Sequence, residues 1–376
     1  MGLALVLAVD AVVVGVEESV PTIERECTRR REFGRIDEFG VERLHGVDSD
    51  LGERRHTVPL HEGILQVGVS ASPAGGANVS VPEIDWAGGR RDSMVNRTHE
   101  TAVVEGHRLH YIAAGDRDAP TLLLLHGGII DAAHVTWGAV IEPLARDYRV
   151  ITLDLLGYGR SAKPDVTYAL STHVDIVESF AETVGLDSPA IAGISMGGGV
   201  ALGLALQSPG LVDRLVSIDS YGLGRELANG RLTYVLAQTQ VQNRVAVALM
   251  RRSRGFTKVS LGNIVHDTDT LSPDAVDAVW EETKRPGVGK AFRRFRAAEV
   301  TSDGYRTDFS GRLSELAVPT LLLHGAHDEV FPHRWSERAA ARIPDSEFRL
   351  LENCAHWAPR ERPDTVVDLI SGFVPR

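Results

Sequence analysis

The sequence predicts an α/β fold in which a mainly parallel sheet is covered by helices on both faces. Two observations carry this prediction: short, continuous apolar runs recur from residue 101 onward, and segments with helical spacing lie between them. Continuous apolar runs indicate strands that are buried on both faces, because a half-exposed strand would alternate apolar and polar residues. Strands that alternate with helices indicate parallel neighbours joined by helical connections.

The expected elements follow one another in a regular order. The first is a hairpin over 101–115, with its turn at Glu105 and Gly106. Later strands are expected at 121–125, 149–155, 190–195, 215–219, 320–324 and 347–351, and helices at 171–184, 196–207, 333–343 and 363–373.

The alternation stops between Gly222 and about Gly311. Helical segments broken by Gly and Pro take its place, at 231–251, 272–284 and 289–298. Because strands resume afterwards, this stretch is expected to be an inserted helical lid over residues 223–311. The predicted core therefore has two parts, residues 94–222 and 312–376.

Residues 1–93 differ in composition from the rest of the chain. They hold three aromatic residues and no tyrosine, with a charged run from Glu24 to Arg35 and a stretch of small residues at 70–77. A stable core is difficult to build from such a composition. We expect an extension that is mostly disordered or weakly structured, and Met94 is an alternative start of the chain.

The overall composition excludes several classes of partner. The formal net charge is −11 and 43% of the residues are hydrophobic, which predicts a soluble protein that binds neither nucleic acid nor anionic membranes. The apolar stretch Gly2–Gly15 lacks a basic start, so we expect a cytoplasmic location. Cys27 and Cys354 are far apart and give neither a disulfide framework nor metal-ligand spacing. The expected partner is a small-molecule substrate, and the oligomeric state stays open.

Ser195 stands in the strongest local motif, Gly193-Ile194-Ser195-Met196-Gly197. The motif follows an apolar strand and opens a helix rich in small residues. In that setting the turn needs flanking glycines, and it lifts the serine above the sheet edge at a helix N-terminus. The amide of Met196 then points to where an oxyanion would form. Ser195 is therefore the candidate nucleophile.

A serine hydroxyl needs a base at neutral pH, and His356 is the candidate. It follows the last expected strand and precedes the final helix. The acid should lie between nucleophile and base in chain order. Asp328, at the carboxyl end of the strand at 320–324, is the first choice, and it would hold and stabilise the imidazole. Asp219 is the main alternative, and Glu329 is a third.

A second oxyanion donor is expected in the loop after the strand at 121–125. This loop reads His126-Gly127-Gly128-Ile129. Glycines let the backbone approach a substrate closely, so the donor is expected to be the amide of Gly128 or Ile129. His126 is expected to brace the loop.

Together these motifs resemble those of the α/β-hydrolase family. The matching segments are, in the family's order, 126–128, 154–161, 193–197, 324–328 and 355–357. The resemblance implies a mostly parallel eight-stranded sheet with a lid after the sixth strand, and hydrolysis by a serine mechanism without a cofactor or metal. It also implies that Trp137 and Trp357 line the substrate pocket.

Gly128, Trp137, the run Ser195-Met196-Gly197-Gly198 and the pair His356-Trp357 give a looser likeness, within the family, to hydrolases that cleave carbon–carbon bonds in ring-fission products. The chain departs from them at Ile129-Ile130-Asp131, where they carry further glycine and proline. In the lid, Val279 precedes Trp280 where they carry an arginine. A small or medium apolar ester is therefore the first expectation for the substrate, and carbon–carbon bond hydrolysis of a diketone is the alternative. A binding protein that keeps the fold without catalysis is a third hypothesis.

Overall fold

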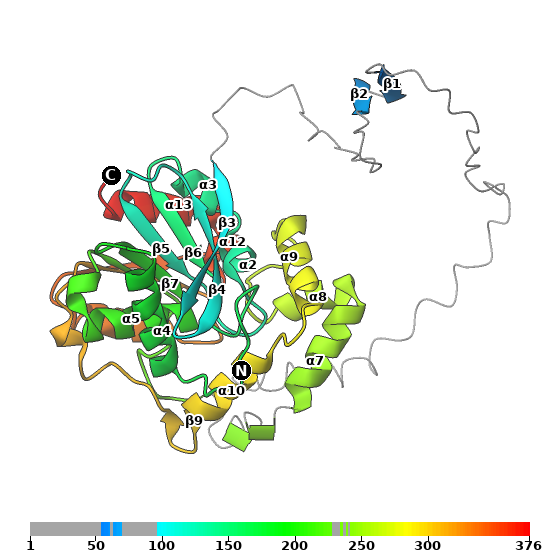
Figure 1. The fold of residues 1–376 in the computed structure, drawn as a ribbon. Helices are drawn as coiled ribbons and strands as arrows, with labels where there is room; N and C mark the ends of the chain where they lie inside the picture. The colour runs from blue at the N-terminus through cyan, green and yellow to red at the C-terminus, as the bar shows by residue number, and fades with distance from the viewer. Residues whose placement is uncertain (1–53, 61–62, 70–95, 228–233, 236–237, 240) are drawn as a thin grey trace. The chain divides into compact units, whose positions relative to one another are not determined.

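The computed structural model describes residues 54–60, 63–69, 96–227, 234–235, 238–239 and 241–376. An eight-stranded sheet forms the centre of its main part (Figure 1). The strands are β3 (Arg97–Val104), β4 (His107–Ala114), β5 (Thr121–Leu125), β6 (Arg149–Leu153), β7 (Ala190–Ile194), β8 (Leu215–Ile218), β11 (Thr320–Gly325) and β12 (Ser346–Leu351). They lie in the order β12-β11-β8-β7-β5-β6-β4-β3.

The sheet is parallel except at one edge. β3 pairs antiparallel with β4, and β4 pairs antiparallel with β6, whereas all other neighbours are parallel. The predicted fold class is thereby confirmed. Because parallel strands end at the same edge, the loops after β5, β7, β11 and β12 come together there.

Two halves of the apolar core lie on opposite faces of the sheet. Within β5, Leu123 and Leu125 enter one half, and Leu122 and Leu124 enter the other. This explains why the strand reads as an unbroken apolar run. The first half includes side chains of α4 (Leu170–Thr183), α5 (Met196–Gln207) and α11 (Arg334–Ala340), and the second includes those of α2 (Ala133–Trp137), α3 (Ile141–Leu144), α12 (Ala358–Glu361) and α13 (Pro363–Phe373).

A helical insertion separates β8 from β11. It contains α7 (Val241–Arg252), α8 (Arg254–Leu261), α9 (Pro273–Thr283), α10 (Lys290–Glu299) and the short hairpin of β9 (Val300–Thr301) and β10 (Gly304–Tyr305). β8 is the sixth strand of this sheet along the chain, so the insertion follows the sixth strand. We call the insertion the lid, and its role as a cover over the substrate stays a prediction. The helix expected at 231–251 falls partly outside the described residues, and α8 was not predicted.

The N-terminal segment contributes one described hairpin, in which β1 (Arg54–Leu60) pairs antiparallel with β2 (Gly63–Val69). It belongs to a separate unit, residues 21–94. These two strands were not expected from the sequence. The expectation of a weakly structured extension otherwise falls on residues outside the described ones. Among the described residues, no helix has the length and apolarity needed to cross a bilayer.

Candidate active site

Ser195 is the single residue between β7 and α5. Its backbone has φ 54° and ψ −120°, a strained conformation for a residue that carries a side chain. The turn leaves no room on either side. A Cβ on Gly193 would clash with the backbone of Gly197, and a Cβ on Gly197 would clash with the backbone oxygens of Leu125 and His126. The two glycines of the motif are therefore required by the turn itself.

Three predicted side chains meet at this edge of the sheet. Nδ1 of His356 lies 2.8 Å from Oδ2 of Asp328, and its Nε2 lies 2.9 Å from Oγ of Ser195. A proton on Nδ1 is donated to the carboxylate, which leaves Nε2 to accept the proton of the serine hydroxyl. The arrangement is that of a Ser-His-Asp triad.

The backbone holds both partners of the serine in place. The amides of Val330 and Phe331 donate to Oδ1 of Asp328, at 2.7 and 3.1 Å. The amide of His356 donates to the carbonyl of Ile264, a lid residue, at 3.0 Å. The imidazole is thus attached to the core through Asp328 and to the lid through its own backbone.

Electrostatics favour an ionised acid beside a basic histidine. Burial raises the pKa of the Asp328 carboxyl, but His356 and His324 outweigh this effect and bring the pKa below its usual range. Burial lowers the pKa of His356, but the Asp328 carboxylate outweighs it and raises the pKa above the ordinary value. His356 is therefore a stronger base than a free imidazole.

The alternative acids do not contact His356. Oδ1 of Asp219 accepts from the amide of Gly325 at 2.8 Å, and its other oxygen has no partner among the described residues. Burial raises the pKa of Asp219. Glu329 is exposed. The geometry thus favours Asp328 over both.

A second histidine lies behind Asp328. Nε2 of His324 lies 3.2 Å from Oδ2 of Asp328 and 3.7 Å from Oδ1 of Asp219. These three residues form a group that resembles a metal-ligand set among the described residues. However, Nε2 of His324 also lies 3.1 Å from the carbonyl of Phe331, which only accepts, so this nitrogen carries a proton and cannot bind a metal. His324 therefore supports Asp328, whereas Asp219 makes no hydrogen bond with either of them.

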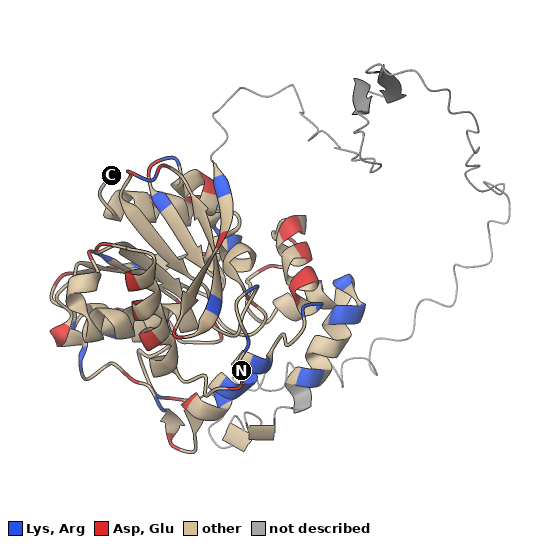
Figure 2. Cartoon of the chain, viewed as in Figure 1, with Lys and Arg blue, Asp and Glu red and all other residues tan. Residues whose placement is uncertain are grey.

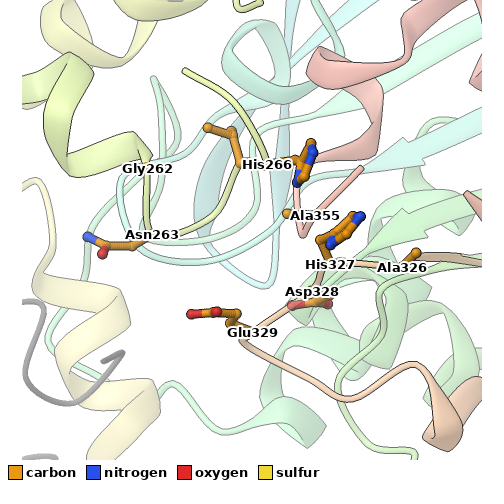
Figure 3. Close-up of a pocket in the computed structure, with 9 residues that line it drawn as sticks. Gly262, Asn263, His266, Ala326, His327, Asp328, Glu329 and Ala355 are labelled. Carbon is orange, nitrogen blue, oxygen red and sulfur yellow. The ribbon is translucent and has the colours of Figure 1, made fainter. Parts of the chain in front are cut away.

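A smaller pocket of about 380 Å³ opens beside Asp328 (Figure 3). The exposed rings of His266 and His327 stack there with centroids 4.1 Å apart. Ser195 does not line this pocket. It is therefore distinct from the space in front of the nucleophile.

His126 supports the loop after β5 through hydrogen bonds of both ring nitrogens. Nδ1 of His126 donates to the carbonyl of Gly127 at 2.8 Å, because its Nε2 accepts from the amide of Leu155 at 3.1 Å. Ile129 has φ 63°, which is rare for a β-branched residue. No hydrogen bond within the described residues engages the amides of Gly128, Ile129 or Met196. These amides are free to receive an oxyanion.

Asp131 and Thr136 support the same loop, and the sequence analysis gave them no role. Asp131 accepts from the amide of Gly127 at 2.9 Å, and Thr136 donates to Asp131 at 2.8 Å. Nε1 of Trp357 donates to Oγ1 of Thr136 at 3.0 Å. This chain links the residue after His356 to the oxyanion loop. The only available signal was the position of Asp131, four residues after Gly127.

Of the two tryptophans expected in the substrate pocket, the structure places one there. Trp357 lines the cavity in front of Ser195, whereas Trp137 does not. Trp137 is fully buried in the core, so the prediction that it lines the pocket is wrong. Its neighbour Thr136 faces the cavity, and successive residues of a helix point in different directions.

The cavity in front of Ser195 has a volume of about 610 Å³, within the range of small-molecule sites. The core contributes the triad face, the oxyanion loop and apolar side chains such as Phe331. The lid contributes mostly apolar side chains, including Leu249, Phe256, Val279 and Phe292. The lid thus closes an apolar chamber over the reacting groups.

Comparison with known proteins shows the family. Residues 120–363 match the family model of the alpha/beta hydrolase fold. The chain belongs to the α/β-hydrolase family. It is therefore an α/β-fold hydrolase.

Relatives in this family include characterised and uncharacterised proteins. The hydrolase is 30% identical over 285 residues to an uncharacterised protein of Mycobacterium tuberculosis, covering 74% of this chain and 81% of the relative. It is 28% identical over 290 residues to the 2-hydroxy-6-oxo-6-(2'-aminophenyl)hexa-2,4-dienoic acid hydrolase of Metapseudomonas resinovorans, covering 75% and 95%. The naproxen esterase of Bacillus subtilis shares the fold, with a TM-score of 0.60, 21% identity and coverage of 74% and 92%.

Proposed function

We propose that the protein is a serine hydrolase that cleaves small or medium apolar esters through an acyl-enzyme. The observation that carries this proposal is the hydrogen-bonded series Ser195–His356–Asp328 at the floor of a mostly apolar cavity. A serine hydroxyl within 2.9 Å of a basic imidazole is an activated nucleophile. Because the triad is complete, a purely binding role is the weaker hypothesis.

In the first step, Oγ of Ser195 attacks the ester carbonyl carbon while Nε2 of His356 takes the hydroxyl proton. The carbonyl oxygen becomes an oxyanion, which the amides of Met196 and of Gly128 or Ile129 stabilise. Asp328 stabilises the imidazolium that forms. Collapse of the tetrahedral intermediate breaks the bond to the alcohol, which leaves with the proton from His356.

In the second step, water hydrolyses the acyl-enzyme. His356 takes a proton from the water, whose oxygen attacks the acyl carbon. The second tetrahedral intermediate collapses, the acid leaves, and Ser195 regains its proton from His356. No cofactor takes part in this sequence.

Carbon–carbon bond hydrolysis is a second candidate function. A relative with 28% identity over 290 residues is a hydrolase of a dienoic acid, and the chain has the His356-Trp357 pair expected of carbon–carbon bond hydrolases. The apolar Val279, which lines the cavity, stands where the resemblance implies an arginine. We therefore rank this activity second. Faster consumption of a dienol ring-fission product than of simple aryl esters would reverse the ranking.

Ester turnover tests the proposal directly. We expect 4-nitrophenyl butanoate to be hydrolysed with an initial burst of nitrophenol, because acylation precedes release of the acid. The Ser195→Ala variant should keep the circular dichroism spectrum and lose both burst and turnover. Absence of turnover of the whole ester panel by the folded wild-type enzyme would contradict the proposal.

A further inference from the structure

One face of helix α10 lies over the reacting groups. Phe292, Phe295, Arg296 and Glu299 all line the cavity, and their spacing of three and four residues places them on the same side of the helix. A Cβ on Gly128 would lie 2.9 Å from the ring of Phe292, so the start of this face covers the oxyanion loop. Arg296 follows one turn later, about 6 Å along the helix axis.

The two charged residues on this face differ in their partners. Glu299 is fully engaged, since it accepts from Tyr221 at 2.9 Å, from the amide of Leu170 at 2.9 Å and from Thr307 at 2.7 Å. It fastens α10 to the core. The guanidinium of Arg296 has no hydrogen bond or ion pair with any described residue. Arg294, which does not line the cavity, pairs instead with Asp165.

Acidic residues are missing from the first part of the lid. No Asp or Glu lies between Glu226 and Asp267, whereas this stretch carries several arginines. Figure 2 shows basic residues along α7 and α10, and acidic ones on α9. Arg293 also lines the cavity and is close enough to Arg244 for their charges to repel. Two arginines, Arg293 and Arg296, therefore line the α10 side of the cavity, where the one acidic residue, Glu299, is already engaged by hydrogen-bond donors.

The hydroxyl of Tyr305 is a second potential ligand for an anion near Arg296. Tyr305 lines the cavity and interacts electrostatically with Arg296. Its hydroxyl makes no hydrogen bond with the described residues. Burial raises the pKa of Tyr305 to about 12, so the group is a donor at neutral pH. Burial also lowers the pKa of Arg296. A partly desolvated cation without a counterion is costly, and a bound anion would remove that cost.

We propose that Arg296, assisted by Tyr305, binds a carboxylate that the substrate carries several bonds away from the ester. The preferred substrates are then half-esters of dicarboxylic acids, held with their carbonyl at Ser195 and their free acid at α10. The apolar lining between these ends accommodates the methylene chain. This inference rests on the proposed esterase activity and adds the substrate class.

Matched substrates test the inference. The 4-nitrophenyl half-esters of glutarate, adipate and suberate are compared with the neutral pentanoate, hexanoate and octanoate. For at least one chain length, the wild-type kcat/KM should be about tenfold or more higher for the half-ester, because a charge-assisted contact is lost in the neutral ester. Arg296→Gln should remove this preference, so that the kcat/KM of the half-ester no longer exceeds that of the matched neutral ester. Arg294→Gln, on the same helix but outside the cavity, should retain the preference.

Binding provides a second measurement that does not depend on turnover. Calorimetry with Ser195→Ala should show tighter binding of the half-ester than of the neutral ester, and Ser195→Ala with Arg296→Gln should not. Preference for the neutral ester at every length, or a preference that survives Arg296→Gln, would overturn the inference and leave the esterase proposal intact. Turnover of neither series by the wild-type enzyme would instead contradict the esterase proposal, and the calorimetry would still decide the role of Arg296.

Discussion

The core and the lid meet at one cavity but contribute to it in different ways. The core supplies the proposed reacting groups, each in a loop or turn that follows a strand and each held by backbone hydrogen bonds. The lid supplies mainly apolar side chains and two arginines, Arg293 and Arg296, all from segments outside the eight-stranded sheet. The difference indicates that the core determines which reaction occurs, whereas the lid determines which substrate enters. Substitutions in the two regions should therefore have separable effects.

The largest loss of activity is expected from substitution of Asp328, the proposed acid in the core. Asp328→Asn removes the charge that orients His356 and stabilises its protonated form, so kcat/KM should fall by about 1,000- to 10,000-fold. The ester assay measures this loss, with Glu329→Gln as the control at the exposed neighbour. Near-normal activity of Asp328→Asn would show that another acid supports His356.

Substitution of Trp137 in the core should affect mainly stability, whereas substitution of Phe292 in the lid should affect mainly substrate specificity. Trp137→Ala empties a fully buried site and should lower the free energy of unfolding by about 3–5 kcal/mol, measured by urea denaturation. Its chain-length preference should stay that of the wild type. Phe292→Ala should instead shift the preference toward longer acyl chains with a smaller loss of stability. An altered preference in Trp137→Ala would contradict the placement of this residue in the core.

The same contrast explains what could be predicted from the sequence. Ser195 and Asp328 follow strands that read as apolar runs, and His356 follows the last expected strand. Because parallel strands end at one edge, their meeting could be anticipated. Trp137 was misplaced because a five-residue helix does not reveal in its sequence which side faces the core. The roles of Asp131, Thr136 and Arg296 depend on contacts between segments far apart in the chain. No local pattern encodes such contacts.

A moderate loss of activity is expected from substitution of Thr136, which supports the oxyanion loop. Thr136→Val removes the hydroxyl that joins Trp357 to Asp131, and the loss of this buried hydrogen bond should lower kcat by about tenfold. KM for neutral esters should change less. Thr183→Val, at an exposed position on α4, is the matched control. An unchanged kcat in Thr136→Val would show that these hydrogen bonds do not contribute to catalysis.

The smallest effect is a displacement of the pH profile. His356 must be neutral to act as base, so activity falls as the pH drops through its pKa, which lies above the ordinary value. Asp219 contributes to that raised pKa. Asp219→Asn should therefore move the acidic limb of kcat/KM to lower pH and leave the alkaline plateau nearly unchanged. Displacement of the acidic limb to higher pH would contradict the inference that Asp219 raises the pKa of His356.

Covalent labelling of Ser195 tests the central claim most directly. The folded wild-type enzyme is treated with a fluorophosphonate, and the site of the adduct is found by peptide mass spectrometry. We predict one adduct on Ser195, none in Ser195→Ala, and slower labelling in Asp328→Asn. An adduct at another residue, or no adduct in folded wild-type protein, would contradict it.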